Sequence, residues 1–68
     1  MNIVKIKTEY IKLDSALKYA GVVMTGGEAK SIIEANVVKV NGEICNIRGK
    51  KLKPGDMIEI YGEKYLIK

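Results

Sequence analysis

The alternation of apolar and polar residues predicts where the chain forms strands and helices. Over residues 2–7, β-branched apolar residues alternate with lysines, which is typical of a short strand. From Lys12 the period changes to three and four, which predicts an amphipathic helix that Gly21 ends. The buried stripe of this helix would be Leu13, Ala16, Leu17 and Ala20.

A second helix is predicted from Gly26 or Gly27 to Ala35. Thr25 stands at the N-cap position with Glu28 three residues later, which is the spacing of a capping box. Asn36 follows, and asparagine tolerates the left-handed backbone conformation in which many helices end. The buried stripe would be Ala29, Ile32 and Ile33.

Three turn signals divide the rest of the chain into short strands. Asn41-Gly42 is typical of a two-residue hairpin loop and would pair Val40 with Glu43 and Val38 with Cys45. Residues 53–56, Lys-Pro-Gly-Asp, predict a second turn. A third, formed by residues 62–63, would join strands 57–61 and 64–67. It would pair Ile60 with Tyr65 and Ile58 with Ile67.

These elements predict an α+β fold, in which two short helices pack on a small, mostly antiparallel sheet. The sheet would gain a strand from the N-terminal segment and a hairpin from the C-terminal segment. Sixty-eight residues cannot divide their apolar side chains between two cores, so we expect one domain over residues 1–68.

Composition excludes several classes of protein. The single cysteine, Cys45, cannot form an internal disulfide, and without histidine the chain lacks the commonest metal ligand and the usual general base. We therefore expect no metal, no cofactor and no catalysis. The N-terminal ten residues lack the pattern of a signal peptide and no segment has the length of a membrane span, so a cytoplasmic protein is expected.

The positive charge is concentrated in one segment. Residues 46–53, called the basic segment below, carry four cations and no acid, which equals the net charge of +4 of the whole chain. These cations are Arg48, Lys50, Lys51 and Lys53. Such a cluster is typical of a surface that binds a polyanion, although a merely solvated loop is an alternative interpretation.

The order of these motifs resembles the S4 domain, an RNA-binding module with the αL motif. The resemblance covers roughly residues 10–60 and rests on Lys12-Leu13-Asp14, Leu17, Gly27 to Lys30 leading to Ile33, Val38-x-Val40-Asn41-Gly42 and Gly55-Asp56-x-Ile58. Residues 25–30 and 48–52 more narrowly resemble the stand-alone bacterial S4 proteins of the YaaA/YbcJ type. The wider S4 pattern often has arginine at the position of Lys12 and Ser-Arg where this chain has Thr-Gly-Gly.

This resemblance implies a non-catalytic protein that binds structured RNA, usually ribosomal RNA or alternatively transfer RNA, and that is associated with the ribosome. We expect it to act as a monomer away from membranes. The candidate RNA-binding residues are Lys12, Thr25, Gly26, Gly27, Lys30, Asn41, Arg48, Lys50, Lys51 and Lys53.

The chemistry of this site would combine amides and cations. The free backbone N–H groups of Gly26, Gly27 and Glu28 would bind phosphate at the start of the second helix, although a tight interhelical turn would also explain the two glycines. Lys12 and Lys30 would add charge there. The basic segment would lie beside the start of the second helix, so that the two line one positive groove.

Two other functions are compatible with the sequence. A small α+β module could dock to an acidic protein surface, although a carrier-like version would need a flexible Gly-Gly tail in place of the final Tyr-Leu-Ile-Lys. An enzyme is the poorest alternative, because capping, turn chemistry and helical spacing explain the carboxylates that might serve as catalysts. These are Asp14, Glu28, Glu34 and Asp56.

Overall fold

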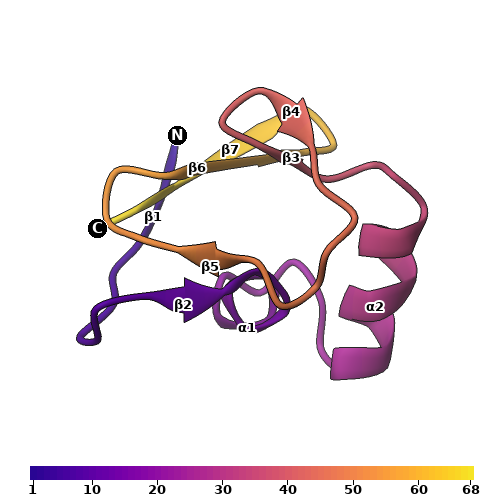
Figure 1. Cartoon of the computed structure of the whole chain (residues 1–68), viewed down its shortest axis with the longest axis horizontal. Helices are drawn as coiled ribbons and strands as arrows, with labels where there is room; N and C mark the ends of the chain where they lie inside the picture. The colour runs from indigo at the N-terminus through magenta and orange to yellow at the C-terminus, as the bar shows by residue number, and fades with distance from the viewer.

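The computed structural model describes all residues from 1 to 68 and contains two helices and seven strands (Figure 1). The helices are α1 (Leu13–Tyr19) and α2 (Gly26–Glu34). The strands are β1 (Asn2–Val4), β2 (Ile11–Lys12), β3 (Lys39–Val40), β4 (Glu43–Ile44), β5 (Lys51–Leu52), β6 (Met57–Ile60) and β7 (Glu63–Ile67). One sheet has the order β1-β7-β6-β3-β4, and β2 and β5 form a separate antiparallel pair. Only β1 and β7 pair in parallel, so the expected α+β fold with a mostly antiparallel sheet is confirmed.

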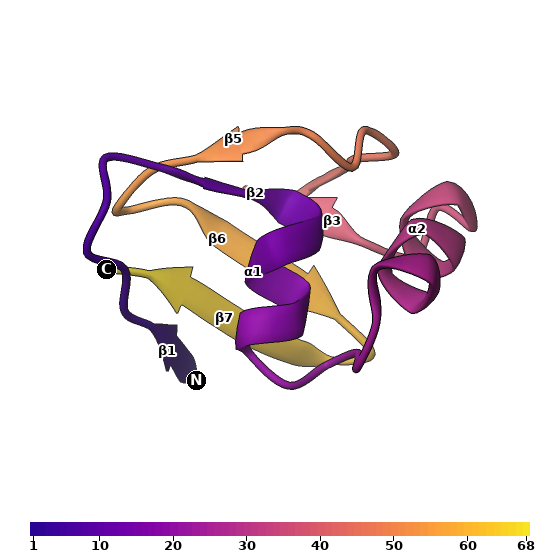
Figure 2. The ribbon, with the colours of Figure 1, turned by 90° about the horizontal axis from the view of Figure 1, so that it is seen from below.

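Helix α1 covers one face of the five-stranded sheet. Seen from below, it lies across β6 and β7, whereas α2 stands at the side of the molecule near β3 (Figure 2). The thirteen buried residues are all apolar. They are Val4, Leu13, Ala16, Leu17, Val23, Ala29, Ile33, Val38, Val40, Leu52, Ile58, Ile60 and Ile67. The core therefore draws on both helices, the sheet and β5, and it fixes the basic segment relative to α1.

The residues predicted to begin and end the two helices are confirmed, with small differences in their hydrogen bonds and burial. Gly21 follows α1 with φ +78°, and Asn36 follows α2 with φ 62°. The hydroxyl of Thr25 accepts a hydrogen bond from the backbone N–H of Glu28 at 3.1 Å. The Glu28 carboxylate, however, accepts from the N–H of Met24 rather than from that of Thr25, so it reaches one residue further back than a standard capping box. Two residues of the predicted stripes are only half-buried: Ile32 of α2, and Ala20, which is the C-cap residue after α1.

The first hairpin has the predicted register. Val40 pairs with Glu43, and the N–H of Cys45 donates to the carbonyl of Val38 at 2.9 Å. Both loop residues, Asn41 and Gly42, have positive φ, as a type I′ turn requires. The predicted turn at residues 53–56 is also present, with φ +102° at Gly55 and a hydrogen bond from the Asp56 N–H to the Lys53 carbonyl.

The register predicted for the terminal hairpin was wrong. Its loop is Tyr61-Gly62, with φ 52° and 77°, and not Gly62-Glu63. Ile60 therefore pairs with Glu63 instead of Tyr65, and Ile58 pairs with Tyr65 instead of Ile67. The type I′ turn takes glycine as its second loop residue, and this choice starts β7 at Glu63. Since the register moves by two residues, each side chain keeps its predicted face of the sheet.

The predicted N-terminal strand over residues 2–7 is shorter than expected. Strand β1 ends at Val4, although the backbone stays bonded to the end of the chain beyond it. The N–H of Lys68 donates to the carbonyl of Val4, and the N–H of Ile6 donates to the carbonyl of Lys68. The C-terminal residue therefore lies beside residues 4–6, and both ends of the chain are on the same side of the molecule (Figure 1).

Candidate RNA-binding surface

The basic segment is bonded through its backbone to the first turn of α1. The carbonyl of Lys50 accepts from the N–H of Leu13 at 2.8 Å, and the carbonyl of Arg48 accepts from the N–H of Asp14 at 3.1 Å. Lys12, the N-cap residue of α1, makes no side-chain capping bond, so these two carbonyls satisfy amides that a helix leaves unpaired at its start. The basic segment is therefore held against the start of α1 by two backbone hydrogen bonds.

Strands β2 and β5 bring two predicted cations together. Lys12 lies directly opposite Lys51 in the antiparallel pair, and both side chains are exposed. Like charges at directly opposed positions destabilise a strand pair, so a bound polyanion would relieve this repulsion. The ammonium of Lys51 also lies 4.9 Å from the ring centroid of Tyr10, which is within the range of a cation–π contact.

Arg48 makes the one ion pair of the structure, and its partner was not predicted from the sequence. Its Nε lies 3.4 Å from Oδ2 of Asp14, and the two side chains are 52% and 18% exposed. No local pattern in the sequence relates Asp14 to a residue 34 positions away. The contact orients the guanidinium and partly neutralises it, while four further N–H donors of Arg48 remain for other acceptors.

The opening of α2 offers two open amides rather than the predicted three, because the N–H of Glu28 is bonded to the Thr25 hydroxyl. The amides of Gly26 and Gly27 belong to the first turn of the helix and have no intrahelical acceptor. A Cβ at Gly26 would meet no atom within 4 Å, and at Gly27 it would meet only the Thr25 hydroxyl at 3.9 Å. Both glycines are the first two residues of α2, directly after the interhelical turn, and no neighbouring atom excludes a side chain at either position.

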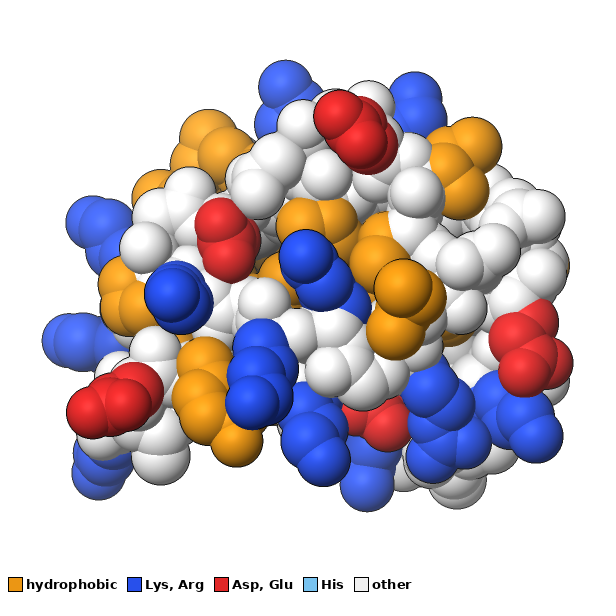
Figure 3. All heavy atoms as spheres, viewed as in Figure 1, with side chains coloured by type: hydrophobic (Ala, Val, Ile, Leu, Met, Phe, Trp, Pro, Cys, Tyr) orange, Lys and Arg blue, Asp and Glu red, His pale blue; other side chains and the backbone are white.

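The two parts of the predicted groove are not joined by direct bonds. No hydrogen bond or ion pair links the basic segment to the opening of α2 or to Lys30. Along the lower edge of the face drawn in Figure 3, where Figure 1 places α1 and the start of α2, Lys and Arg side chains gather with acidic ones between them. The tightest assembly of predicted residues is thus Lys12, Arg48, Lys50 and Lys51, with Tyr10 and Asp14 added by the structure.

Asn41 has both ends of its side chain bonded within the protein. Its Oδ1 accepts from the N–H of Met57 at 2.9 Å, and its Nδ2 donates to Asp56 Oδ1 at 3.1 Å. Asp56 Oδ2 accepts from the N–H of Lys53 at 2.8 Å. These bonds, called the Asn41–Asp56 clasp below, tie the first hairpin to the turn at residues 53–56. They indicate a folding role for Asn41.

The clasp also lowers the pKa of Asp56 below its ordinary value of 3.8. The hydrogen bond from the Lys53 N–H has the largest effect, and partial burial of the carboxylate opposes it. The hydrogen bond from Asn41 and the positive charges of Lys50 and Lys53 lower the pKa further. All of the lowering effects favour the charged carboxylate, so Asp56 is an anion at neutral pH.

Outside this surface, the residues with possible chemical roles are Cys45 and the acidic side chains. Cys45 is half-buried, with Sγ 3.8 Å from the carbonyl oxygen of Ile47. No three Cys, Asp or Glu side chains lie close enough together to hold a metal ion. Neither helix combines the length and apolar character that crossing a membrane requires.

The chain is similar in sequence to known proteins of two kinds. The chain is 46% identical over 61 residues to the "Probable ribosome maturation protein RlbA" of Bacillus subtilis strain 168, an alignment that covers 90% of this chain and 86% of that protein. It is 39% identical over 49 residues to the small ribosomal subunit protein uS4 of Coxiella burnetii strain RSA 493 and 41% identical to that of Wolbachia pipientis wMel. These alignments cover 72% of this chain but only 24% of each uS4 protein, so the chain spans about a quarter of uS4. The family model of the S4 domain matches residues 4–68, and the chain therefore belongs to the S4 domain family.

Proposed function

We propose that this protein binds structured ribosomal RNA through charge and shape and takes part in ribosome maturation without catalysing a reaction. The relatives support the ribosomal part of this proposal, since one is named as a ribosome maturation protein and the others as proteins of the small ribosomal subunit. Neither name describes an enzyme. Ribosomes mature in the cytoplasm, which is where we propose that residues 1–68 act as one binding unit.

The observation that carries the proposal is the attachment of the basic segment to the start of α1. Two backbone hydrogen bonds, from Leu13 to Lys50 and from Asp14 to Arg48, hold the segment in place. Cations on a fixed backbone lose less conformational freedom on binding than cations on a mobile loop, so more of their attraction to phosphate appears as affinity. Lys12 and Lys51 on the adjoining strand pair extend the same surface.

The opening of α2 supports a second phosphate contact. Glycine inside a helix costs up to about 1 kcal/mol relative to alanine, and no neighbouring atom of the protein requires it at Gly26 or Gly27. A phosphate that approaches the two amides closely would account for the absence of side chains there. Lys30, exposed one turn further along α2, would add charge.

Recognition would depend on the RNA backbone more than on base sequence. Six exposed cations belong to the proposed surface, and Tyr10 is its only aromatic side chain. Contacts with phosphate position a protein on RNA, whereas reading a single-stranded sequence usually requires several aromatic platforms. The proposed cations are Lys12, Lys30, Arg48, Lys50, Lys51 and Lys53.

The test is to replace Arg48, Lys50 and Lys51 together with alanine and to measure RNA affinity over a range of salt concentrations. A matched variant replaces the exposed Lys5, Lys7 and Lys64, so that both triple variants lose three positive charges. The first variant should bind ribosomal RNA much more weakly and lower the salt-dependence slope by about two to three, because each lost phosphate contact removes roughly 0.7–0.9 from the slope. The second variant should lose much less RNA affinity.

Thermal unfolding of both triple variants provides the control for folding. All six side chains are exposed, so the unfolding temperature should remain close to that of the wild-type protein. Equal losses of RNA affinity in the two variants would mean that net charge alone determines binding. Unchanged affinity in the first variant would overturn the proposed surface.

A further inference from the structure

A pocket lies beside the proposed RNA-binding surface, between the β3–β4 hairpin and the segment that leads to β5. It encloses about 360 Å³, near the lower end of the range of small-molecule sites. The middle of the face in Figure 3 is hollowed at this position, with apolar side chains visible inside. Its lining is Val40, Asn41, Glu43, Ile44, Cys45, Asn46, Ile47 and Lys50.

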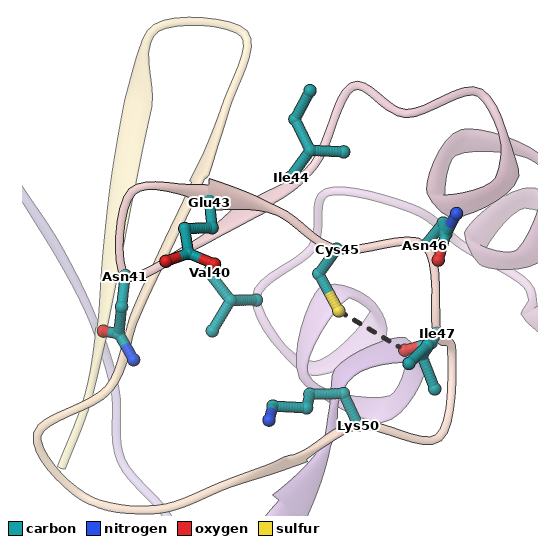
Figure 4. A pocket seen from close by; sticks show the side chains of 8 residues that line it. All are labelled: Val40, Asn41, Glu43, Ile44, Cys45, Asn46, Ile47 and Lys50. Atoms are coloured by element: carbon teal, nitrogen blue, oxygen red, sulfur yellow. Dashed lines mark hydrogen bonds between the residues drawn. The ribbon is translucent and has the colours of Figure 1, made fainter.

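Half of the residues that line the pocket are apolar, and the pocket is open to solvent. Ile44 and Ile47 are 57% and 62% exposed, and Val40 and the Cys45 sulfur contribute to the same surface. In Figure 4 the side chains of Val40, Cys45 and Ile47 border the hollow, whereas that of Ile44 points away from it. Val40, Cys45 and Ile47 therefore supply the apolar surface that a ligand in the pocket would contact.

A hydrogen-bond donor and an acceptor border this apolar surface without pairing with each other. Glu43 on β4 and Lys50 next to β5 extend from opposite sides, with Val40 between them (Figure 4). The single ion pair of the structure joins Arg48 and Asp14, so the Glu43 carboxylate and the Lys50 ammonium are not within ion-pair distance. The pocket therefore offers apolar walls together with one anion and one cation that are held apart.

We infer that this pocket binds one unpaired nucleobase of an RNA held by the basic segment. A nucleobase has apolar faces that match the surface formed by Val40, Cys45 and Ile47. Its edge carries both the donors that Glu43 would accept from and the acceptors that Lys50 would donate to. Lys50 belongs to both sites, since its backbone carbonyl accepts from Leu13 at the start of α1. The inference rests on the proposed function and adds that unpaired bases are a preferred target.

Cys45 provides a direct probe, because it is the only cysteine and lines the pocket. Three short RNA hairpins are compared: one with a single-nucleotide bulge, one with a bulged abasic nucleotide and one fully paired. At saturating RNA, the bulged hairpin should slow the reaction of Cys45 with a thiol reagent relative to the other two. Equal reactivity with all three bound RNAs would overturn the inference and leave the proposed function intact. Failure of all three RNAs to bind at low salt would overturn both.

A variant connects the protection of Cys45 to the pocket walls. Ile47→Ser removes one apolar wall, and Ile3→Ser is the matched control, since Ile3 is 52% exposed on β1 at the opposite edge of the sheet. Ile47→Ser should weaken binding of the bulged hairpin by roughly tenfold and leave the paired hairpin unaffected, whereas Ile3→Ser should change neither. Protection of Cys45 by RNA-free ribosomal proteins, and not by the bulged hairpin, would assign the pocket to a protein partner instead.

Discussion

The guanidinium of Arg48 lies 3.4 Å from the carboxylate of Asp14, while the carbonyl of the same arginine accepts a hydrogen bond from the Asp14 backbone N–H at 3.1 Å. These two residues are thus joined through both backbone and side chain. The backbone bond fixes the basic segment against α1, and the ion pair sets an acidic group among the cations that we propose to contact RNA.

Replacing Asp14 with asparagine should increase RNA affinity about two- to fivefold, because it removes the acid that competes with phosphate for Arg48. The amide oxygen of asparagine can still accept the hydrogen bond from the Ser15 N–H, so the free energy of unfolding should change by less than about 1 kcal/mol. Titration of ribosomal RNA at two salt concentrations measures the affinity. Glu63→Gln, an exposed change on β7, serves as the control for net charge. A fall in affinity would indicate that Asp14 acts mainly by orienting Arg48.

Alanine at Gly26 and Gly27 should affect stability and binding in opposite directions. A Cβ at either position meets open space or an ordinary contact, so the double variant should raise the free energy of unfolding by up to about 2 kcal/mol. The same methyl groups would keep phosphate from the amides and weaken RNA binding. Chemical unfolding and RNA titration measure the two effects. Ser31→Ala, an exposed change later in α2, should stabilise the helix without weakening binding. A stabilised glycine variant that binds RNA as well as wild type would exclude the opening of α2 from the interface.

Replacing Asn41 with glycine should lower the free energy of unfolding by roughly 1–3 kcal/mol, because it removes two hydrogen bonds of the clasp. Glycine accepts the φ of 53° at this position without strain but adds backbone freedom to the unfolded chain, whereas alanine would add about 1 kcal/mol of backbone strain. Asn36→Gly is the matched control at another left-handed residue. Urea unfolding measures all three variants. If Asn41→Gly unfolds like wild type but loses RNA affinity, Asn41 contacts RNA after all.

The lowered pKa of Asp56 predicts how the stability of the fold depends on pH in acid. An aspartate whose pKa is lower in the folded than in the unfolded state stabilises the fold above its ordinary pKa, and this stabilisation is lost as the pH falls through the folded value. Asp56→Asn should therefore be less stable than wild type at about pH 7, and the difference should shrink as the pH falls from about 3.8 toward 2. Thermal unfolding across this range provides the measurement. A difference in stability between the two proteins that stays constant with pH would contradict the lowered pKa of Asp56.

Much of the secondary structure could be predicted from the sequence because it depends on neighbours within four residues. The apolar stripe of α1, the Thr25 cap and the Asn41-Gly42 loop are of this kind. Local patterns did not determine the register of the terminal hairpin. Both possible two-residue loops, 61–62 and 62–63, contain Gly62, and both place every side chain on the same face of the sheet. Tyr61 occupies a left-handed conformation that its residue type does not favour, so the pairing of β6 with β7 must impose it.

The sequence by itself determined the family motifs, the cluster of cations over residues 46–53 and most of the turns, since each is a local pattern of residue types. Only the tertiary structure decided that Arg48 meets Asp14, that Lys12 lies opposite Lys51 and that Asn41 closes a clasp with Asp56. These contacts join residues 15 to 39 positions apart. They form because burial of Leu13, Leu17 and Leu52 sets α1 and β5 against the sheet, and periodicity along the chain carries no information about that packing.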